Sequence, residues 1–207
     1  PHAVEAMAVY AAMVDRLDQG IGRVLDKVKA LGKEENTLVM FLSDNGGCAE
    51  ELHRTPEIPP GTVDSYQTVG AAWANASNTP FRLYKQFCHE GGIRTPLIVH
   101  WPAGLKTKSG SITREVSHVF DIMPTCLDLA GVKPLAQIKG NKTHPMNGKS
   151  LTLIFQNQTR TPHSVLYWDH AQGAAIRKDG WKLVRAGRKK GKWELYQINE
   201  DRVELKN

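Results

Sequence analysis

The sequence has few of the features that mark specialised protein classes. Cys48, Cys88 and Cys126 are its only cysteines, and their wide spacing predicts neither a zinc cluster nor a disulfide framework. No apolar run approaches the ~18 residues of a membrane-spanning helix, so we predict no membrane span. Residues 1–5 contain neither a basic segment nor an initiating methionine, so no signal peptide is visible. We therefore interpret the chain as a piece of a longer protein.

The chain has fewer acidic than basic residues. The chain has 21 Asp and Glu against 27 Lys and Arg, a formal net charge of +6. Between Arg177 and Lys192 lie eight basic residues and a single acidic one, with Trp181 and Trp193 interleaved. This run is compatible with a nucleic-acid patch, with a solvated hairpin, or with attraction of an anionic substrate. We favour the hairpin and predict no nucleic-acid partner.

One segment, residues 37–47, raises the question of a metal site. It reads T-L-V-M-F-L-S-D-N-G-G, and its unbroken apolar run, Leu38–Leu42, predicts a buried strand. The strand ends on Asp44, Asn45 and two glycines. These residue types suit a tight turn, and the side-chain oxygens of Asp and Asn also suit a hard cation. From this segment alone both interpretations stay open.

The residues before this strand predict an α/β fold. Apolar residues recur at three- and four-residue steps from Met7 to Leu31, which predicts an amphipathic helix with Gly32 as its C-terminal cap. A helix, a short turn and a fully apolar strand are typical of a parallel sheet covered on both faces. In such sheets ligands bind beyond the carboxyl ends of strands, where Asp44 and Asn45 would lie.

The rest of the chain predicts two parts. Residues 48–79 lack strong periodicity, and a loop of this length is expected to shape a site. The remaining predicted elements are a strand at 97–101, a helix at 119–130, and short strands at 165–168, 174–177, 181–184 and 193–196, with a hairpin turn at 178–180. We predict an α/β domain over 1–149 and a small antiparallel β subdomain over 150–207.

Several motifs in a fixed order resemble the C-terminal half of the sulfatases, arylsulfatase type. They are F-L-S-D-N-G at 41–46, Lys85, E-G-G-I-R-T-P at 90–96, A-V-Y-A-A-M-V-D at 8–15, and W-E-L-Y at 193–196. The resemblance implies an alkaline-phosphatase-like fold, a large α/β/α sandwich followed by a small antiparallel sheet. It also implies hydrolysis of a sulfate ester, aryl or carbohydrate, and a periplasmic, extracellular or lysosomal location.

The same resemblance implies roles for particular residues. Asp44 and Asn45 are expected to bind one Ca²⁺, in preference to Mg²⁺, and Asp44 is expected to act as base beside the nucleophile. Lys85 is expected to contact the sulfate and its bridging oxygen, which gains negative charge as the sulfur–oxygen bond breaks. Independently of the resemblance, we expect Arg94 to anchor the Gly-Gly turn through a salt bridge. We expect no thiol–base role for Cys88, because it and its neighbour in sequence seldom point together in an extended segment.

The nucleophile of the family is not in this chain. It is a formylglycine made from the Cys or Ser of a C/S-x-P-x-R motif, and no cysteine or serine here fits that pattern. We expect it, with the remaining metal ligands, in an N-terminal half that acts as the partner of this chain. The 207 residues alone are then expected to be inactive. Two alternatives stay open: a phosphomonoesterase or phosphodiesterase of the same superfamily, and an inactive fragment or interaction module.

Overall fold

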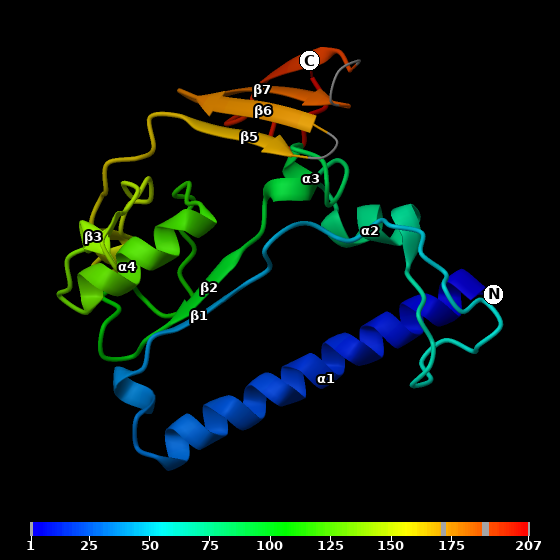
Figure 1. Cartoon of the computed structure of the whole chain (residues 1–207), viewed down its shortest axis with the longest axis horizontal. Coiled ribbons are helices and arrows are strands. Elements are labelled where there is room, and N and C mark those ends of the chain that lie inside the picture. Colours follow the sequence, from blue (N-terminus) through cyan, green and yellow to red (C-terminus); the bar gives the residue numbers. More distant parts are fainter. Residues whose placement is uncertain (1, 171–172, 188–190, 207) are drawn as a thin grey trace. The chain divides into compact units, whose positions relative to one another are not determined.

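The computed structural model describes residues 2–170, 173–187 and 191–206 (Figure 1). The elements in chain order are α1 (His2–Ala30), η1 (Glu34–Asn36), β1 (Val39–Leu42), α2 (Gly70–Asn78), α3 (Glu90–Ile93), β2 (Leu97–His100), η2 (Val119–Asp121), α4 (Ile122–Leu129), β3 (Gln137–Ile138), β4 (Asn141–Lys142), α5 (Thr152–Phe155), β5 (Leu166–His170), β6 (Gly173–Lys178), β7 (Trp181–Ala186) and β8 (Trp193–Gln197). Helices and sheets, including a small antiparallel sheet, confirm the predicted α/β class.

The chain forms two compact units. The first contains the described residues of 1–33, 40–98 and 165–207, and the second contains 34–39 and 99–164. The boundary between an α/β domain and a β subdomain, which we place between residues 149 and 150 from the sequence, stays a prediction. No helix within the described residues is long and apolar enough to cross a membrane.

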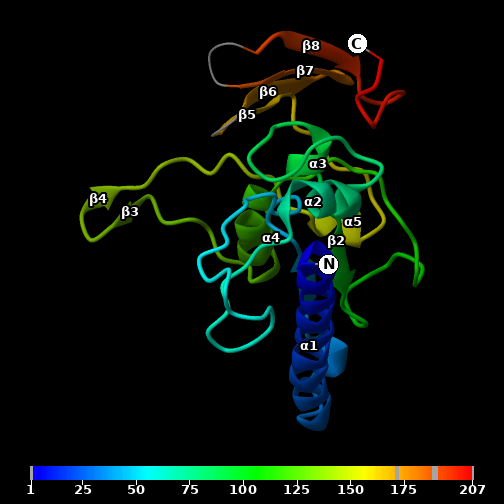
Figure 2. The same ribbon diagram turned by 90° about the vertical axis from the view of Figure 1, so that its right-hand side faces the viewer.

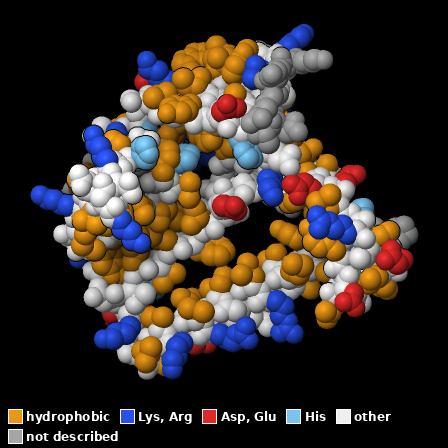
Figure 3. All heavy atoms as spheres, in the orientation of Figure 1, with side chains coloured by type: hydrophobic (Ala, Val, Ile, Leu, Met, Phe, Trp, Pro, Cys, Tyr) orange, Lys and Arg blue, Asp and Glu red, His pale blue; other side chains and the backbone are white. Residues whose placement is uncertain are grey.

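The first helix forms as its periodicity predicts. Glu5 in its first turn and Lys27 and Lys29 in its last turn oppose the partial charges at the helix ends. Gly32 follows with a φ of 64°, a conformation that favours glycine at the end of a helix. The described residues leave the apolar stripe of α1 largely uncovered, and the figure shows basic side chains on the other side of the helix (Figure 3).

The two strands of the predicted central sheet pair with each other. β1 and β2 form a two-stranded sheet. We predicted that β1 is buried, and within the described residues this is wrong, because Phe41 is 45% exposed. Ile98 on β2 is 60% exposed. A continuous apolar run predicts a strand that is covered on both faces, but two paired strands alone leave such faces open.

The C-terminal sheet has the antiparallel order β5-β6-β7-β8 (Figure 2). The turn between β6 and β7 contains Asp179 and Gly180, both with positive φ, which confirms the predicted hairpin. Along the strands, residues alternate between a packed face and an open face. Ala175, Val184 and Tyr196 form the packed face with Cys88.

The basic run of this sheet is not uniformly solvated. Lys178 is exposed, as expected, but Lys182 is completely buried, so the expectation of a solvated face is wrong at that position. The physical reason is that Lys182 points to the packed face, where the carboxylates of Glu90 and Glu204 compensate its positive charge. Arg188, Lys189 and Lys190 of the predicted run lie outside the described residues.

A buried aspartate organises the second unit. Asp121, at the junction of η2 and α4, accepts hydrogen bonds from the backbone N–H groups of His118 and Lys149 at 3.0 and 2.8 Å. It also pairs with Arg160 at 3.1 Å and with His163 at 2.9 Å. Burial would raise the pKa of Asp121, but these hydrogen bonds and the Arg160 charge hold that pKa below its usual value.

Glycines allow three backbone segments to approach closely near α3. We predicted a tight turn at Gly91-Gly92, which is wrong, because both residues lie in the single helical turn of α3. Gly46 donates its N–H to the Gly92 oxygen at 3.0 Å, and a Cβ on Gly46 would lie 1.8 Å from the Gly91 oxygen. A Cβ on Gly91 would lie 2.1 Å from the Leu83 oxygen. These glycines are therefore required for close approach.

Replacing Gly91 by alanine should test this requirement. The added methyl group would collide with backbone, so we expect Gly91→Ala to lower the free energy of unfolding by about 1–3 kcal/mol. Gly22 in α1 has no atom within 4 Å of an added Cβ, so Gly22→Ala should be neutral or stabilise by about 0.5–1 kcal/mol. Urea unfolding of both variants measures the difference, and equal effects would contradict the close-approach explanation.

Candidate active site

The predicted metal ligands lie in a bend directly after β1. Ser43 donates its hydroxyl to the backbone oxygen of Asn45 at 2.9 Å, and Thr95 donates to the backbone oxygen of Ser43 at 2.7 Å. The backbone is thus fixed, whereas the side chains of Asp44 and Asn45 have no hydrogen bond or ion pair with any described residue. Asp44 is exposed. Two oxygen-bearing side chains are therefore available at the end of the strand.

The described residues do not complete a metal site by themselves. No group of three or more His, Cys, Asp or Glu side chains among them is arranged to hold a metal ion. Asp44 and Asn45 would supply two oxygens, while Ca²⁺ takes about six to eight. The donor types fit calcium, and the number of donors requires further ligands.

Backbone hydrogen bonds join the bend to the segment that carries Lys85. The Lys85 N–H donates to the Gly47 oxygen at 3.0 Å. Gly47 donates its own N–H to the Asn78 side-chain oxygen at 3.0 Å, and the Asn78 side-chain nitrogen donates to the Leu83 oxygen at 3.0 Å. Segments about forty residues apart in the sequence are thereby held together.

The Lys85 side chain lies near the carboxylate of Glu50, which we did not predict as a site residue. Its ammonium lies 3.9 Å from Oε1 of Glu50, and both side chains are 37% exposed. Gln86 donates its side-chain N–H to the same oxygen at 2.9 Å. Glu50 lies in the stretch without periodicity, so the sequence contains no pattern that pairs it with Lys85.

The helix α2, which supports this region, was not predicted from the sequence. α2 lies within residues 48–79, where we expected a loop. It buries Ala74, and its last residue is the Asn78 that binds Gly47. The segment G-A-A-W-A-N-A-S-N has small residues on every side, so it shows no apolar stripe. Its alanine content was the available signal, because alanine has the highest helix propensity.

The E-G-G helix is fixed by buried charges. Glu90 is 3% exposed and pairs with Lys182 at 2.7 Å, and Lys182 also lies 2.7 Å from Glu204. Glu204 accepts a hydrogen bond from the Glu90 N–H at 2.8 Å. The predicted salt bridge of Arg94 is present, at 3.3 Å from Glu90. The C-terminal sheet and the last described residues therefore hold α3 in place.

A second cluster adjoins this one. Arg82 donates to Glu194 at 3.1 Å, to the Tyr196 hydroxyl at 2.7 Å and to the Glu204 backbone oxygen at 2.7 Å. The Tyr196 hydroxyl also donates to Glu194. Burial, and then the hydrogen bond to Glu194, raise the pKa of Tyr196 to about 12. Tyr196 therefore stays protonated at neutral pH and keeps its role as a donor.

Cys88 and His89 are both buried beside these clusters. His89 lies 3.4 Å from Glu194 and is fully buried, and burial lowers its pKa. Burial raises the pKa of the Cys88 thiol. A buried, protonated thiol is a weak nucleophile, and the absence of a catalytic role for Cys88 stays a prediction.

Comparison with known protein families identifies the family of this chain. The Sulfatase family profile matches residues 2–132, and the profile for the C-terminal part of N-sulphoglucosamine sulphohydrolase matches residues 81–207. The chain belongs to the sulfatase family. Its C-terminal position within that family agrees with the resemblance of its motifs.

Individual relatives and a solved structure support this assignment. An uncharacterised sulfatase of Schizosaccharomyces pombe is 35% identical over 99% of the chain and 40% of its own length. An arylsulfatase of Klebsiella aerogenes is 33% identical over 80% of the chain and 38% of its own length. The crystal structure of Ps i-CgsB in complex with k-i-k-neocarrahexaose matches with a TM-score of 0.68 and 25% identity, over 96% of the chain and 38% of that structure.

These matches have two consequences. The predicted alkaline-phosphatase-like fold is confirmed, because the structural neighbours of the chain include sulfatases of that fold. The chain spans about two fifths of the length of these two relatives.

Replacing Lys182 should show how strongly the buried charges hold α3. Lys182→Met would leave Glu90 and Glu204 buried with less compensating charge, and we expect a loss of about 3–5 kcal/mol in the free energy of unfolding. Lys178→Met is the matched control, since Lys178 is an exposed lysine of the same hairpin and should change stability by less than about 0.5 kcal/mol. Denaturant unfolding measures both, and similar small losses would contradict a structural role for Lys182.

Proposed function

We propose that this chain is the C-terminal portion of a sulfatase that hydrolyses an aryl or carbohydrate sulfate ester. The observation that carries the proposal is the hydrogen bonding of the Asp44–Gly47 bend to the backbone of Lys85. This contact supports the proposal that Asp44, Asn45 and Lys85 act in one site. Membership of the sulfatase family supports the reaction class.

Asp44 and Asn45 would hold one Ca²⁺ in the complete protein. Both side chains are available after β1, and their oxygens suit a hard cation better than a soft one. When bound, calcium would neutralise negative charge on the sulfate oxygens. Asp44 would also act as the base beside the nucleophile, a formylglycine outside this chain.

Lys85 would bind the sulfate and stabilise the leaving oxygen. Its backbone is fixed to Gly47, and its ammonium has three N–H donors to offer an anion. An ammonium placed beside the bridging oxygen would stabilise the charge that develops there as the sulfur–oxygen bond breaks. The net charge of +6 would favour the approach of an anionic ester.

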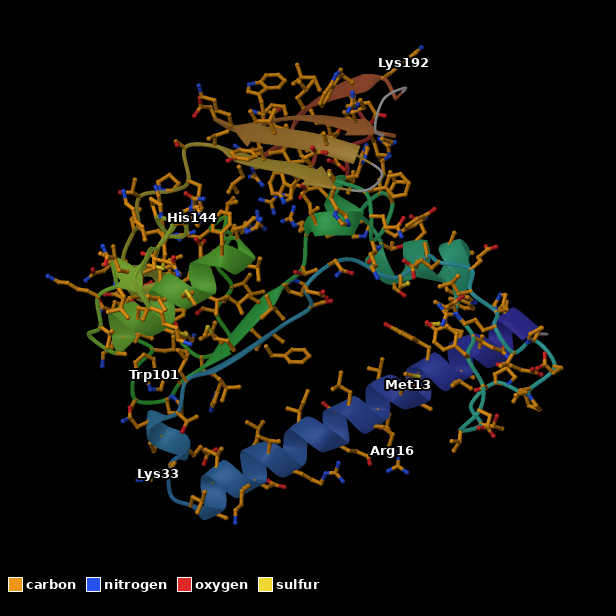
Figure 4. All side chains as sticks on the ribbon, viewed as in Figure 1. Met13, Arg16, Lys33, Trp101, His144 and Lys192 are labelled. Atoms are coloured by element: carbon orange, nitrogen blue, oxygen red, sulfur yellow. The ribbon has the colours of Figure 1, made fainter. Side chains whose placement is uncertain are left out.

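The remaining part of the protein would cover the apolar surface of α1. Val14, Leu17 and Val24 are 48%, 55% and 63% exposed, and soluble proteins rarely leave such a stripe open. A groove of about 540 Å³ lies beside the stripe, and Met13, Arg16 and Leu17 of α1 line it together with Gly61 (Figure 4 labels Met13 and Arg16). We propose that the N-terminal half packs here and supplies the nucleophile. We also propose a periplasmic, extracellular or lysosomal location for the protein.

Replacing Asp44 should weaken calcium binding in the complete protein. Asp44→Ala removes one charged ligand, so we expect a loss of calcium affinity that calorimetry can measure. Asp64→Ala removes an exposed aspartate of the following loop and should leave the affinity unchanged. Equal calcium affinity in the wild type and Asp44→Ala would refute the assignment.

Replacing Lys85 should slow hydrolysis more than it weakens substrate binding. In the complete protein we expect Lys85→Ala to lower kcat roughly a hundred- to a thousandfold, as loss of one preorganised donor does, with calcium binding retained. The loss should be larger for poor leaving groups. Steady-state kinetics on a series of aryl sulfates measure it, with the exposed Lys108→Ala as control.

The same assays separate the proposed function from its alternatives. Faster hydrolysis of the matching phosphate esters would favour a phosphoesterase. The 207-residue chain alone should hydrolyse neither ester, because it lacks the nucleophile motif. Turnover of an aryl sulfate by this chain alone would overturn the proposal that the nucleophile lies elsewhere.

A further inference from the structure

We infer that Glu50 positions Lys85 for its role at the sulfate, an inference that rests on the function proposed above. The observation is a carboxylate that approaches the Lys85 ammonium from the loop following the Asp44–Gly47 bend. Glu50 would not touch the substrate. It would act through Lys85, by restricting where the ammonium can lie.

The backbone around Lys85 is already fixed. Its N–H donates to the Gly47 oxygen, and the nearby residues Leu83 and Gln86 have φ values of 61° and 82°, which residues other than glycine rarely adopt. Such strained conformations persist where the surrounding structure enforces them, and they are frequent at functional sites. The position of the Lys85 Cα is therefore determined by contacts that do not involve its side chain.

The backbone does not determine where the ammonium lies. A lysine side chain has four methylene groups, so its charged end can occupy many positions around a fixed Cα. Among the described residues, Glu50 has the one carboxylate within 4 Å of the Lys85 ammonium. Its Oε1 also accepts the Gln86 hydrogen bond at 2.9 Å, and its Oε2 lies 3.7 Å from the Cys48 sulfur. These contacts hold the carboxylate itself in place.

The length of the ion pair suits a positioning role. At 3.9 Å the ammonium is attracted to Glu50 but is too far away for a direct hydrogen bond, so its N–H donors remain available to another anion. Both side chains are about one third exposed, and ion pairs of this kind contribute little to stability. Removal of the Glu50 charge should therefore alter the orientation of Lys85 without unfolding the protein.

The test is a double-mutant cycle in the complete protein. Glu50→Gln keeps an oxygen that can accept the Gln86 hydrogen bond but loses the charge that attracts Lys85. We expect kcat for aryl sulfates to fall about tenfold with KM little changed, a loss typical of residues that orient a functional group. The dependence on the leaving group should steepen, as in Lys85→Ala. In the Lys85→Ala background the second substitution should cause no further loss.

Controls and outcomes separate this inference from the proposed function. Glu51→Gln, which neutralises the adjacent exposed carboxylate, should retain the wild-type rate, and urea unfolding should show equal stability for Glu50→Gln and the wild type. A wild-type rate in Glu50→Gln, or an undiminished loss in the Lys85→Ala background, would overturn the positioning role while leaving the sulfatase proposal intact. If the complete wild-type protein hydrolyses no sulfate ester, the proposed function fails, and this inference fails with it.

Discussion

The close approach of three backbone segments at Gly46, Gly91 and Gly92 is the constraint on which the candidate site depends. Atoms of the Arg82–Phe87 segment occupy the space that a Cβ on Gly91 or Gly92 would need. The same contacts place Gly47 within hydrogen-bonding distance of the Lys85 backbone. Side chains at these glycines would separate the end of β1 from the segment that carries Lys85, and the two parts of the candidate site would no longer meet.

Buried charges extend this constraint to the C-terminal sheet. Glu90 sits at the start of α3 beside the glycines, and its charge is compensated by Lys182 from β7. Arg82 connects the segment before Lys85 to Glu194 and Tyr196 of β8. A buried ion pair contributes little net stability but is costly to break, so it favours one arrangement of the segments over others. The small sheet thus supports the candidate site without contributing a candidate catalytic residue to it.

Much of the secondary structure could be predicted from local patterns. The period of α1, the apolar run of β1 and the hairpin turn at 178–180 each reflect interactions between residues close in sequence. The same reasoning failed for α2, whose small residues give no stripe, and for Lys182, whose burial depends on carboxylates far away in the chain. It also assigned a tight turn to Gly91-Gly92, because glycine permits both unusual φ values and close packing, and the sequence does not distinguish them.

By itself, the sequence determined the order of the motifs and hence the sulfatase resemblance, together with the candidate residues Asp44, Asn45 and Lys85. Residue type and position after an apolar strand made Asp44 and Asn45 candidates, and the sulfatase resemblance added Lys85 and the expected roles. Only the tertiary structure decided that the bend after β1 and the Lys85 segment meet, that Glu50 lies beside the Lys85 ammonium, and that buried charges fix α3. The physical reason is that these contacts join residues 35 to 114 positions apart. Contacts at such separations leave no local periodicity in the sequence.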